Sequence, residues 1–302
     1  MKIKLLLILL MLPIVVISFK KKETNFILKK IKDNSSKSCL VEEKITIINN
    51  NKSETIPLND YIYGVVASEM PASFNYEALK AQAIVSRSYI LARCKTNNCQ
   101  VGTNTDYQVY NDEDTFKTKW GNKYNEYHQK IKKAVLETDN MVITYDDEII
   151  EAFYFSMSNG YTEKSDSVFS DYLPYIKSVK LDESLNNNYE KTVELSINDF
   201  KEKLNISGHI TIKDIIRNET NRVTSININN KKFSGVEIRK LLNLRSTDFE
   251  INVINNLVNI KTRGYGHGVG MSQYGANQLA NDGANYIEII NFYYNNVLLN
   301  KI

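Results

Sequence analysis

One glutamate in this sequence stands where its carboxyl group could act as a general acid. Glu69 lies two residues before Pro71 and ends an apolar run whose members recur at helical spacing. We therefore predict an amphipathic helix over residues 59–69, which stops there because the residue before a proline disfavours helical backbone. The last turn of a helix is partly negative and disfavours a carboxylate, and apolar neighbours raise the carboxyl pKa further. The alternative interpretation is an exposed glutamate at a frayed helix end.

A glycine-rich turn around one histidine is the second group that could do chemistry. Four glycines surround His267 in the segment 263–270, where they let the backbone approach a ligand closely and leave the imidazole exposed. The segment lacks the Lys-Ser/Thr pair of a Walker A loop, and its glycine spacing differs from that of a dinucleotide-binding fingerprint. It is either a structural turn or, with Gln273 at the start of the next helix, a turn that lines a substrate.

The segment that follows the first helix must help to position these groups. Residues 77–93 are mostly alanines, serines and aliphatics, which predicts a helix packed on several sides. Gln82 and Arg87 interrupt its apolar surface as either ordinary buried polar groups or groups that reach a site. A later block at 156–160, rich in hydroxyls and ending in a glycine, is either a strand exit or a ligand-facing loop.

Five blocks of the sequence, in the same order, resemble the stage II sporulation protein D family. They are EMP at 69–71 with EALKAQA at 77–83, SRSY at 86–89, QVY at 108–110, SMSNGYTE at 156–163 and GYGHGVGMSQYGA at 264–276. The resemblance implies a lytic transglycosylase that cleaves the MurNAc–GlcNAc bond of peptidoglycan glycan strands, with a 1,6-anhydro product, during engulfment in a spore-forming bacterium. It also implies that Glu69 is the catalytic acid.

A single acid is sufficient for this reaction when the sugar's own C6 hydroxyl is the attacking group. Glu69 would protonate the glycosidic oxygen and then, as a glutamate, accept the proton of that hydroxyl. Ordinary glycosidases need two carboxylates, and we find no second acid in comparable context, because Asp106, Asp112 and Glu163 are interpreted as solvated turn residues. The expected substrate-binding side chains are those of Arg87, Gln82, Tyr110, Ser158, Tyr161, His267 and Gln273.

Modules of similar sequence also act as non-catalytic enhancers of cell-wall amidases, which is the alternative function. Glu69 would then be a glycan-binding or a structural residue. The partners implied by the resemblance are peptidoglycan glycan strands, a sporulation cell-wall amidase similar to SpoIIP and membrane engulfment proteins. A net charge of +3 without a basic stripe argues against nucleic acid as a partner.

The cysteines leave more than one chemical state open in an exported protein. Cys94 and Cys99 flank a short loop, which favours a disulfide or two free thiols, and Cys39 is left over. Some members of the resembled family bind zinc here through two cysteines and a preceding histidine, but all three histidines of this chain lie downstream. Two sulfurs alone do not complete a tetrahedral site, so no cofactor is predicted, and zinc is possible but not favoured.

The amino terminus predicts attachment to the cell membrane. An apolar run at residues 5–19 lies between lysines, and no small-residue cleavage site follows it. This favours an uncleaved anchor over a cleaved signal peptide, although the run is short for a full span. We expect a single N-terminal anchor with the catalytic domain outside the cytoplasm, in the septal space of the sporangium.

The remaining pattern predicts an α+β protein, with mixed helices and antiparallel strands around a glycan-binding groove. Strands are expected at 44–49, 141–145, 148–156, 223–228 and 252–262, and helices at 125–138, 197–204, 236–242, 271–281 and 286–294. The expected divisions are 1–22 as membrane anchor or uncleaved signal, 23–52 as stalk, 53–190 as catalytic core, 191–260 as a smaller α+β subdomain, and 261–302 as the C-terminal part of the core.

Overall fold

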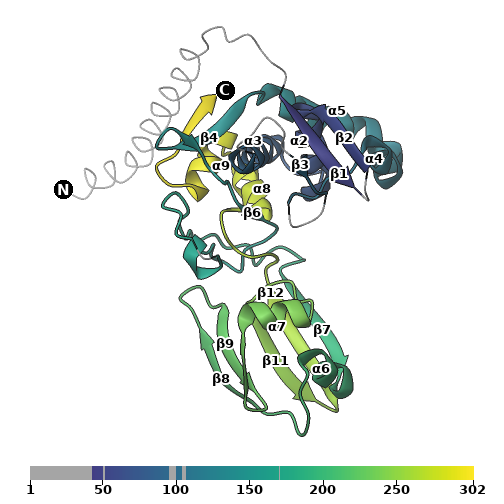
Figure 1. Cartoon of the computed structure of the whole chain (residues 1–302), viewed down its shortest axis with the longest axis vertical. Helices are drawn as coiled ribbons and strands as arrows, with labels where there is room; N and C mark the ends of the chain where they lie inside the picture. Colours follow the sequence, from purple (N-terminus) through teal and green to yellow (C-terminus); the bar gives the residue numbers. More distant parts are fainter. Residues whose placement is uncertain (1–42, 50–51, 95–99, 104–106, 170) are drawn as a thin grey trace, which may run out of the picture.

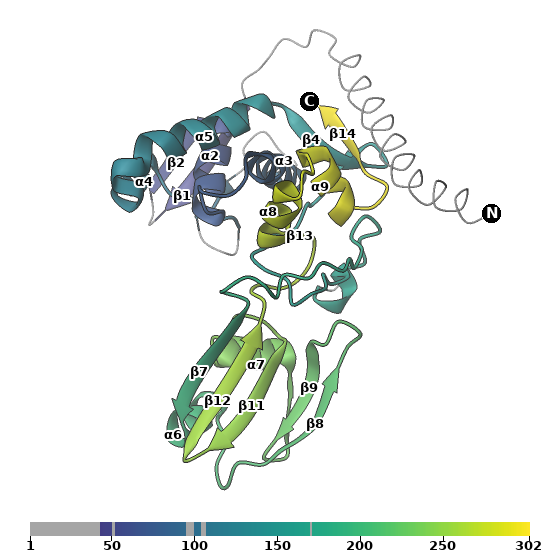
Figure 2. The same cartoon turned by 180° about the vertical axis from the view of Figure 1, so that it is seen from behind.

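The computed structural model describes residues 43–49, 52–94, 100–103, 107–169 and 171–302. The expected anchor at 1–22, most of the expected stalk, and Cys39, Cys99 and Asp106 lie outside the described residues. Figures 1 and 2 show a larger part, built from both ends of the described chain, and a smaller part built from its middle. Within the described residues, no helix is long and apolar enough to span a membrane.

The larger part is organised around one helix, α3 (Tyr76–Arg93), that is buried on nearly all sides. The side chain of Asn75 accepts a hydrogen bond from the Glu77 N–H and caps its N-terminus. Every residue from Ala78 to Ile90 except Lys80 is buried, in agreement with the small and aliphatic composition. The helices that pack against it are α2 (Leu58–Glu69), α5 (Tyr124–Glu137), α8 (Gln273–Asn281) and α9 (Tyr286–Tyr293). The helix α4 (Glu113–Trp120) packs on α5, and the 3-10 turns are η1 (Gly121–Lys123) and η2 (Ser165–Ser167).

Three small sheets complete the larger part. The strands are β1 (Lys44–Asn49), β2 (Lys52–Pro57), β3 (Gln100–Val101), β4 (Met141–Tyr145), β5 (Glu148–Ile149), β6 (Tyr154–Phe155), β13 (Met271–Ser272) and β14 (Leu298–Lys301). β1 lies between β2 and β3, and β4 lies between β14 and β5. Because β4 packs against α3, the last strand of the chain, β14, is paired to a strand that contacts this helix (Figure 2). β6 and β13 pair in parallel and join two sequence blocks that are far apart in the chain.

The smaller part has its own sheets and its own apolar core. Its elements are β7 (Glu190–Ser196), α6 (Ile197–Leu204), β8 (Ile212–Arg217), β9 (Val223–Ile228), β10 (Lys231–Ser234), α7 (Gly235–Leu241), β11 (Phe249–Ile254) and β12 (Leu257–Arg263). Two antiparallel sheets form, with strand orders β11-β12-β7 and β10-β9-β8. Phe200, Ile226, Ile238 and Ile260 belong to a core that is separate from that of the larger part. These two cores support the subdomain that we propose at 191–260.

A buried polar joint connects the two parts. The Asn159 side-chain amide donates to the Thr220 carbonyl at 2.8 Å and to the Asp248 carboxylate at 2.9 Å. Glu163 is 1% exposed and pairs with Arg222 at 3.2 Å. Our interpretation of Glu163 as a solvated turn residue is therefore wrong, because its cationic partner comes from a distant segment that no local pattern reveals.

Two predicted strands are wrong in their extent. The strand predicted at 148–156 is split into β5 and β6, because the chain turns into the core at Ile150. The strand predicted at 252–262 is the hairpin of β11 and β12, in which Asn255 and Asn256 adopt φ of 48° and 62° and make the turn. The other predicted elements are confirmed to within about two residues at each end, α4 was not predicted, and the α+β class is confirmed.

Candidate active site

Glu69 is the last residue of α2, as predicted. The helix ends because Met70, which precedes Pro71, adopts extended backbone with φ −117° and ψ 138°. Oε1 of Glu69 accepts hydrogen bonds from the Val109 N–H at 2.8 Å and from the Tyr154 phenol at 3.3 Å. Both of these donors, which belong to the described part of the chain, bind Oε1, so Oε2 is the oxygen that remains for a proton or a ligand.

Burial keeps a proton on Glu69 to higher pH than on an ordinary glutamate. Desolvation raises the pKa of Glu69 and is the largest effect, whereas the hydrogen bonds from Val109 and Tyr154 favour the charged form and lower the pKa. The net direction is upward. The unpaired carbonyls at the end of α2 act in the same direction, because they disfavour a negative charge. Glu69 therefore holds its proton to higher pH than an ordinary glutamate, which favours the acid form that a general acid requires.

The cleft beside Glu69 has a volume of about 390 Å³ and combines aromatic with polar side chains. It is formed by the end of α2 and the segment after it, the end of α4, one residue each of α5 and of the segment after β6, and the start of α8. The lining residues that bear on function are Glu69, Lys119, Trp120, Tyr127, Gln273 and Tyr274. Flat aromatic faces beside hydrogen-bonding groups are suited to a sugar chain, which carries both C–H faces and hydroxyls.

A buried chain of hydrogen bonds supports Glu69 from the protein side. The Tyr154 phenol accepts from the Gln108 amide at 3.1 Å, and Gln108 in turn accepts from the Tyr61 phenol at 3.3 Å. Burial raises the pKa of both phenols, so both keep their protons and remain donors. Gln108 belongs to the QVY block and Tyr61 to α2, so separate segments converge on the one acid.

Gln82 and Gln273 link α3 with the start of α8. Nε2 of Gln273 donates to Oε1 of Gln82 at 3.4 Å, and Gln82 donates to Oγ of Ser86 at 2.9 Å. Gln273 lines the cleft with Glu69, whereas Gln82 is fully buried on α3. The structure thus brings Gln273 to the cleft directly and Gln82 only through Gln273.

Arg87 is fully buried and serves the packing of the larger part. Its guanidinium donates to the carbonyls of Thr138 and Met141 at 2.7 and 3.2 Å, and to Oδ1 of Asn59 at 3.2 Å. These bonds join α3 to α2 and to the segment that leads into β4. None of these partners lines the cleft of Glu69.

Tyr110 and Tyr161 do not line the cleft of Glu69. Tyr110 stacks on Tyr61 with ring centroids 5.6 Å apart, and a Cβ at Gly64 would lie 2.3 Å from its ring. It faces a separate pocket on the other side of the Val109 segment. Tyr161 is exposed, with the Lys180 ammonium 5.6 Å from its ring centroid.

His267 is half-buried against aromatic rings, so the expectation of an exposed imidazole is wrong. Nδ1 accepts from the Val269 N–H at 3.1 Å, and the ring also hydrogen-bonds to the Tyr154 backbone. Burial, assisted by Arg239, lowers the pKa of His267 to about 4, which keeps it neutral. The surrounding rings are those of Phe153, Phe155 and Phe169. The glycines permit close backbone packing, since a Cβ at Gly270 would lie 1.9 Å from the Phe153 carbonyl oxygen.

Ser158 binds a buried glutamate that the sequence did not single out. Glu183 accepts from the Ser158 hydroxyl at 2.6 Å and from the Ser272 hydroxyl at 2.9 Å. Ser272 in turn accepts from the Gly275 N–H at 3.2 Å and caps α8, one residue before Gln273. Burial raises the pKa of Glu183 to about 7. Ser158 of the hydroxyl-rich block therefore faces inward and helps to fix the start of α8, whereas Ser156, the first residue of the block, lines the cleft of Glu69.

Sequence reasoning missed Tyr154, Gln108 and Glu183. Tyr154 stands among apolar residues of a predicted strand and looks like a packing residue, and Glu183 stands in a polar segment that looks solvated. Gln108 offered one usable signal, because it begins the QVY block, whose family likeness was already noted. A buried amide that begins such a block has to find hydrogen-bond partners.

Cys94, the residue after α3, is disulfide-bonded. Cys99, its expected partner, lies outside the described residues. A disulfide sulfur carries no thiolate charge, so Cys94 in this state is not a metal ligand.

Fold and site together define an α+β protein whose cleft presents one protonatable glutamate. The family profile described as "SpoIID: Stage II sporulation protein" matches residues 47–145. The chain is 40% identical over 259 residues to stage II sporulation protein D of Bacillus amyloliquefaciens, covering 82% of this chain and 75% of that protein. The same protein of Bacillus subtilis is 40% identical over 258 residues, covering 81% and 75%. This chain therefore belongs to the stage II sporulation protein D family.

A more distant relative carries a different name. The amidase enhancer of Bacillus subtilis is 28% identical over 289 residues, covering 76% of this chain and 39% of that protein. Its similarity extends over most of this chain but over less than half of the relative.

Proposed function

We propose that this protein is a lytic transglycosylase that cleaves the MurNAc–GlcNAc bond of peptidoglycan glycan strands during engulfment in sporulation. The observation that supports this most is the Glu69 carboxyl group, which has a raised pKa and borders a cleft with aromatic and polar walls. Membership of the stage II sporulation protein D family supports a role in sporulation.

In this mechanism Glu69 acts twice. The proton on Oε2 passes to the glycosidic oxygen as the bond from C1 to that oxygen breaks, which leaves Glu69 as a carboxylate. The Val109 N–H and the Tyr154 phenol stabilise this carboxylate through Oε1. The C6 hydroxyl oxygen then bonds to C1 and closes the 1,6-anhydro ring, and its proton passes to Glu69. The acid form is restored, and no water is consumed.

The reaction needs no second carboxylate, and two further buried acids with a raised pKa are held elsewhere. Glu183 is bound by Ser158 and Ser272, Glu163 is paired with Arg222, and neither lines the cleft of Glu69. Two carboxylates facing one cleft would have favoured hydrolysis instead. A single acid beside the cleft is consistent with an intramolecular attack.

We also propose where and with what the protein acts. The apolar run within residues 1–22 would hold it on the outer face of the cell membrane, in the septal space of the sporangium. A sporulation cell-wall amidase similar to SpoIIP and membrane engulfment proteins would act beside it. Membrane fractionation tests this: full-length protein should stay with membranes through a salt wash, and a mature protein that begins just after the apolar run would overturn the anchor.

A second candidate function is that of a non-catalytic enhancer of a cell-wall amidase. The similarity to the amidase enhancer of Bacillus subtilis favours it. Glycan would then bind in the cleft without being cleaved, and Glu69 would be a binding residue.

Product analysis distinguishes the two functions. Purified protein is incubated with glycan strands, and the products are analysed by mass spectrometry for 1,6-anhydro ends. Glu69→Gln keeps the size of the side chain but cannot deliver a proton, so cleavage should fall by roughly two to four orders of magnitude while glycan binding persists. Glu126→Gln, an exposed glutamate on α5, is the matched control and should cleave normally. No anhydro ends from the unaltered protein would favour the enhancer.

A further inference from the structure

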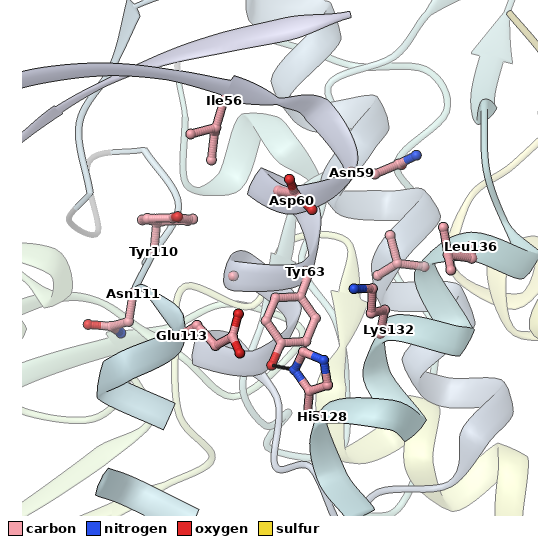
Figure 3. A pocket seen from close by; sticks show the side chains of 12 residues that line it. Ile56, Asn59, Asp60, Tyr63, Tyr110, Asn111, Glu113, His128, Lys132 and Leu136 are labelled. Carbon is pink, nitrogen blue, oxygen red and sulfur yellow. Dashed lines mark hydrogen bonds between the residues drawn. The ribbon is translucent and has the colours of Figure 1, made fainter. Parts of the chain in front are cut away.

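A second pocket lies between α2, α4 and α5. Its volume is about 360 Å³, similar to that of the Glu69 cleft, and the two share no lining residue. Figure 3 shows Asp60, Tyr110, Glu113, His128 and Lys132 around the ring of Tyr63. The proposed mechanism uses none of these side chains.

Two lining charges of opposite sign are held by no direct contact in the described part of the chain. Among the described residues, neither Asp60 nor Lys132 makes a hydrogen bond or an ion pair, and both are exposed to solvent at the pocket. With Glu113 the three charges sum to about −1, so the pocket does not suit a phosphate or another polyanion. It offers an ammonium donor, carboxylate acceptors and phenol rings together, which is what the hydroxyls and C–H faces of a sugar need.

The aromatic side chains inside this pocket are preorganised. The Tyr63 hydroxyl lies 2.9 Å from Nδ1 of His128, and their ring centroids are 5.1 Å apart. The Tyr124 hydroxyl donates to Glu113 and lies 3.3 Å from the same His128 nitrogen. These bonds fix the rings before a ligand arrives, which reduces the entropy that binding loses.

A continuous series of rings joins this pocket to the Glu69 cleft. Tyr63 contacts Phe116 at a centroid distance of 5.9 Å, and Phe116 stacks on Trp120 at 4.9 Å. Trp120 then contacts Tyr127 at 5.7 Å, and these last two line the cleft of Glu69. The two pockets therefore lie on either side of one aromatic cluster on α4 and α5, as sites for successive parts of one polymer would.

The backbone segment that holds Glu69 also forms a wall of the second pocket. The Val109 N–H binds Glu69, and the next two residues, Tyr110 and Asn111, line the pocket. Asn111 donates to the Ser68 hydroxyl at 3.0 Å, beside Glu69 on α2. A ligand in the pocket would therefore rest on the same segment that positions the acid.

We infer that the pocket between α2, α4 and α5 is a second saccharide-binding site that holds a stretch of the glycan strand outside the Glu69 cleft. The identity of the polymer rests on the proposed function. The site adds binding energy for long strands and little for short ones, because only a long strand reaches both pockets.

The test is a titration of the full-length protein, carrying Glu69→Gln to prevent cleavage, with N-acetylated chito-oligosaccharides of increasing length. Trp120 is the one tryptophan of the chain and lines the cleft, so its fluorescence reports binding. Affinity should rise by about tenfold or more from the disaccharide to the octasaccharide. The double variant Asp60→Ala/Lys132→Ala should lose that gain but bind the disaccharide as before. Lys133→Ala, at an exposed neighbour outside the pocket, should keep the gain.

Two results would overturn the inference. They are a parent protein whose affinity does not rise with length and a double variant that keeps the full gain. Failure of the proposed function is distinguishable, because it appears as absent 1,6-anhydro ends from the unaltered protein while the length-dependent binding remains.

Discussion

The Tyr154 phenol donates a hydrogen bond to Oε1 of Glu69 at 3.3 Å, although 85 residues separate the two in the chain. This bond stabilises the charged carboxylate and opposes the effect of burial on the pKa of Glu69. Because Tyr154 also accepts from Gln108, its hydroxyl has a fixed direction. The pair therefore sets the pH range in which Glu69 can give and take a proton.

Tyr154→Phe should move the pH profile of cleavage. Removing a donor to the charged form raises the pKa of Glu69 further, so the acid form persists to higher pH and the alkaline limb of the kcat profile should shift upward by about one pH unit. The rate at the optimum should fall, because the carboxylate formed in the first step loses one of its two donors. An unchanged alkaline limb would show that Tyr154 does not control Glu69. Tyr161→Phe, at an exposed tyrosine, is the control.

Glu183→Gln should flatten the dependence of stability on pH. The pKa of Glu183 is raised to about 7, above the ordinary value of 4.5, so the folded state binds more protons than the unfolded chain between these values. The contribution of Glu183 to stability is therefore present below about pH 4.5 and is lost as the pH rises to about 7. Urea denaturation at intervals from pH 5 to 8 should show a decline of on the order of 1–3 kcal/mol that the variant lacks. If the free energy of unfolding fell equally with pH in both proteins, Glu183 would not be the source of the pH dependence.

His267 should remain neutral over the range in which an ordinary histidine titrates. Its pKa is lowered to about 4 by burial, so its imidazole NMR signals should not move between pH 5 and 8. The same protein unfolded in urea serves as control and should show histidine titration near about 6.5. His267→Ala should reduce stability by about 2–4 kcal/mol through the cavity left among three phenylalanines. Unaltered stability with lost glycan binding would instead make His267 a ligand-binding residue.

Removing one member of the buried pair Glu163–Arg222 should damage the joint between the two parts. Arg222→Met leaves an uncompensated buried carboxylate and should cost about 3–5 kcal/mol in thermal or chemical unfolding. The double variant Glu163→Gln/Arg222→Met should recover part of this loss, because no buried charge is left alone. Additive losses would mean that the two side chains are not coupled.

The helices and the acid were predictable from the sequence because their signals are local. The stop of α2 at Met70 follows from Pro71, and the burial of α3 follows from its small residues. The hairpin turn also has a local signal, the pair Asn255 and Asn256. The sequence pattern hides this turn because apolar alternation continues on both sides of it.

The surroundings of the acid could not be predicted, because they depend on contacts between distant segments. Tyr154 reaches Glu69 only once β6 has paired with β13, and Glu183 reaches Ser272 across 89 residues. His267 was expected to be exposed because glycines flank it, yet close packing of those glycines is what buries it. A run of glycines shows that the backbone can be approached closely. It does not show whether a ligand or another segment of the protein makes that approach.

The burial of α3 has a consequence for the order in which the chain can fold. The backbone N–H of the capping residue Asn75 donates to the Asn277 side chain, and Glu77 accepts from the Tyr286 N–H. The surroundings of α3 are therefore incomplete until nearly the last residues have emerged. The core of the smaller part comes from one continuous stretch and can form earlier. While the chain is being synthesised, the apolar helix α3 therefore stays uncovered beside a part that can already fold. That interval is the one in which this protein is most exposed to aggregation.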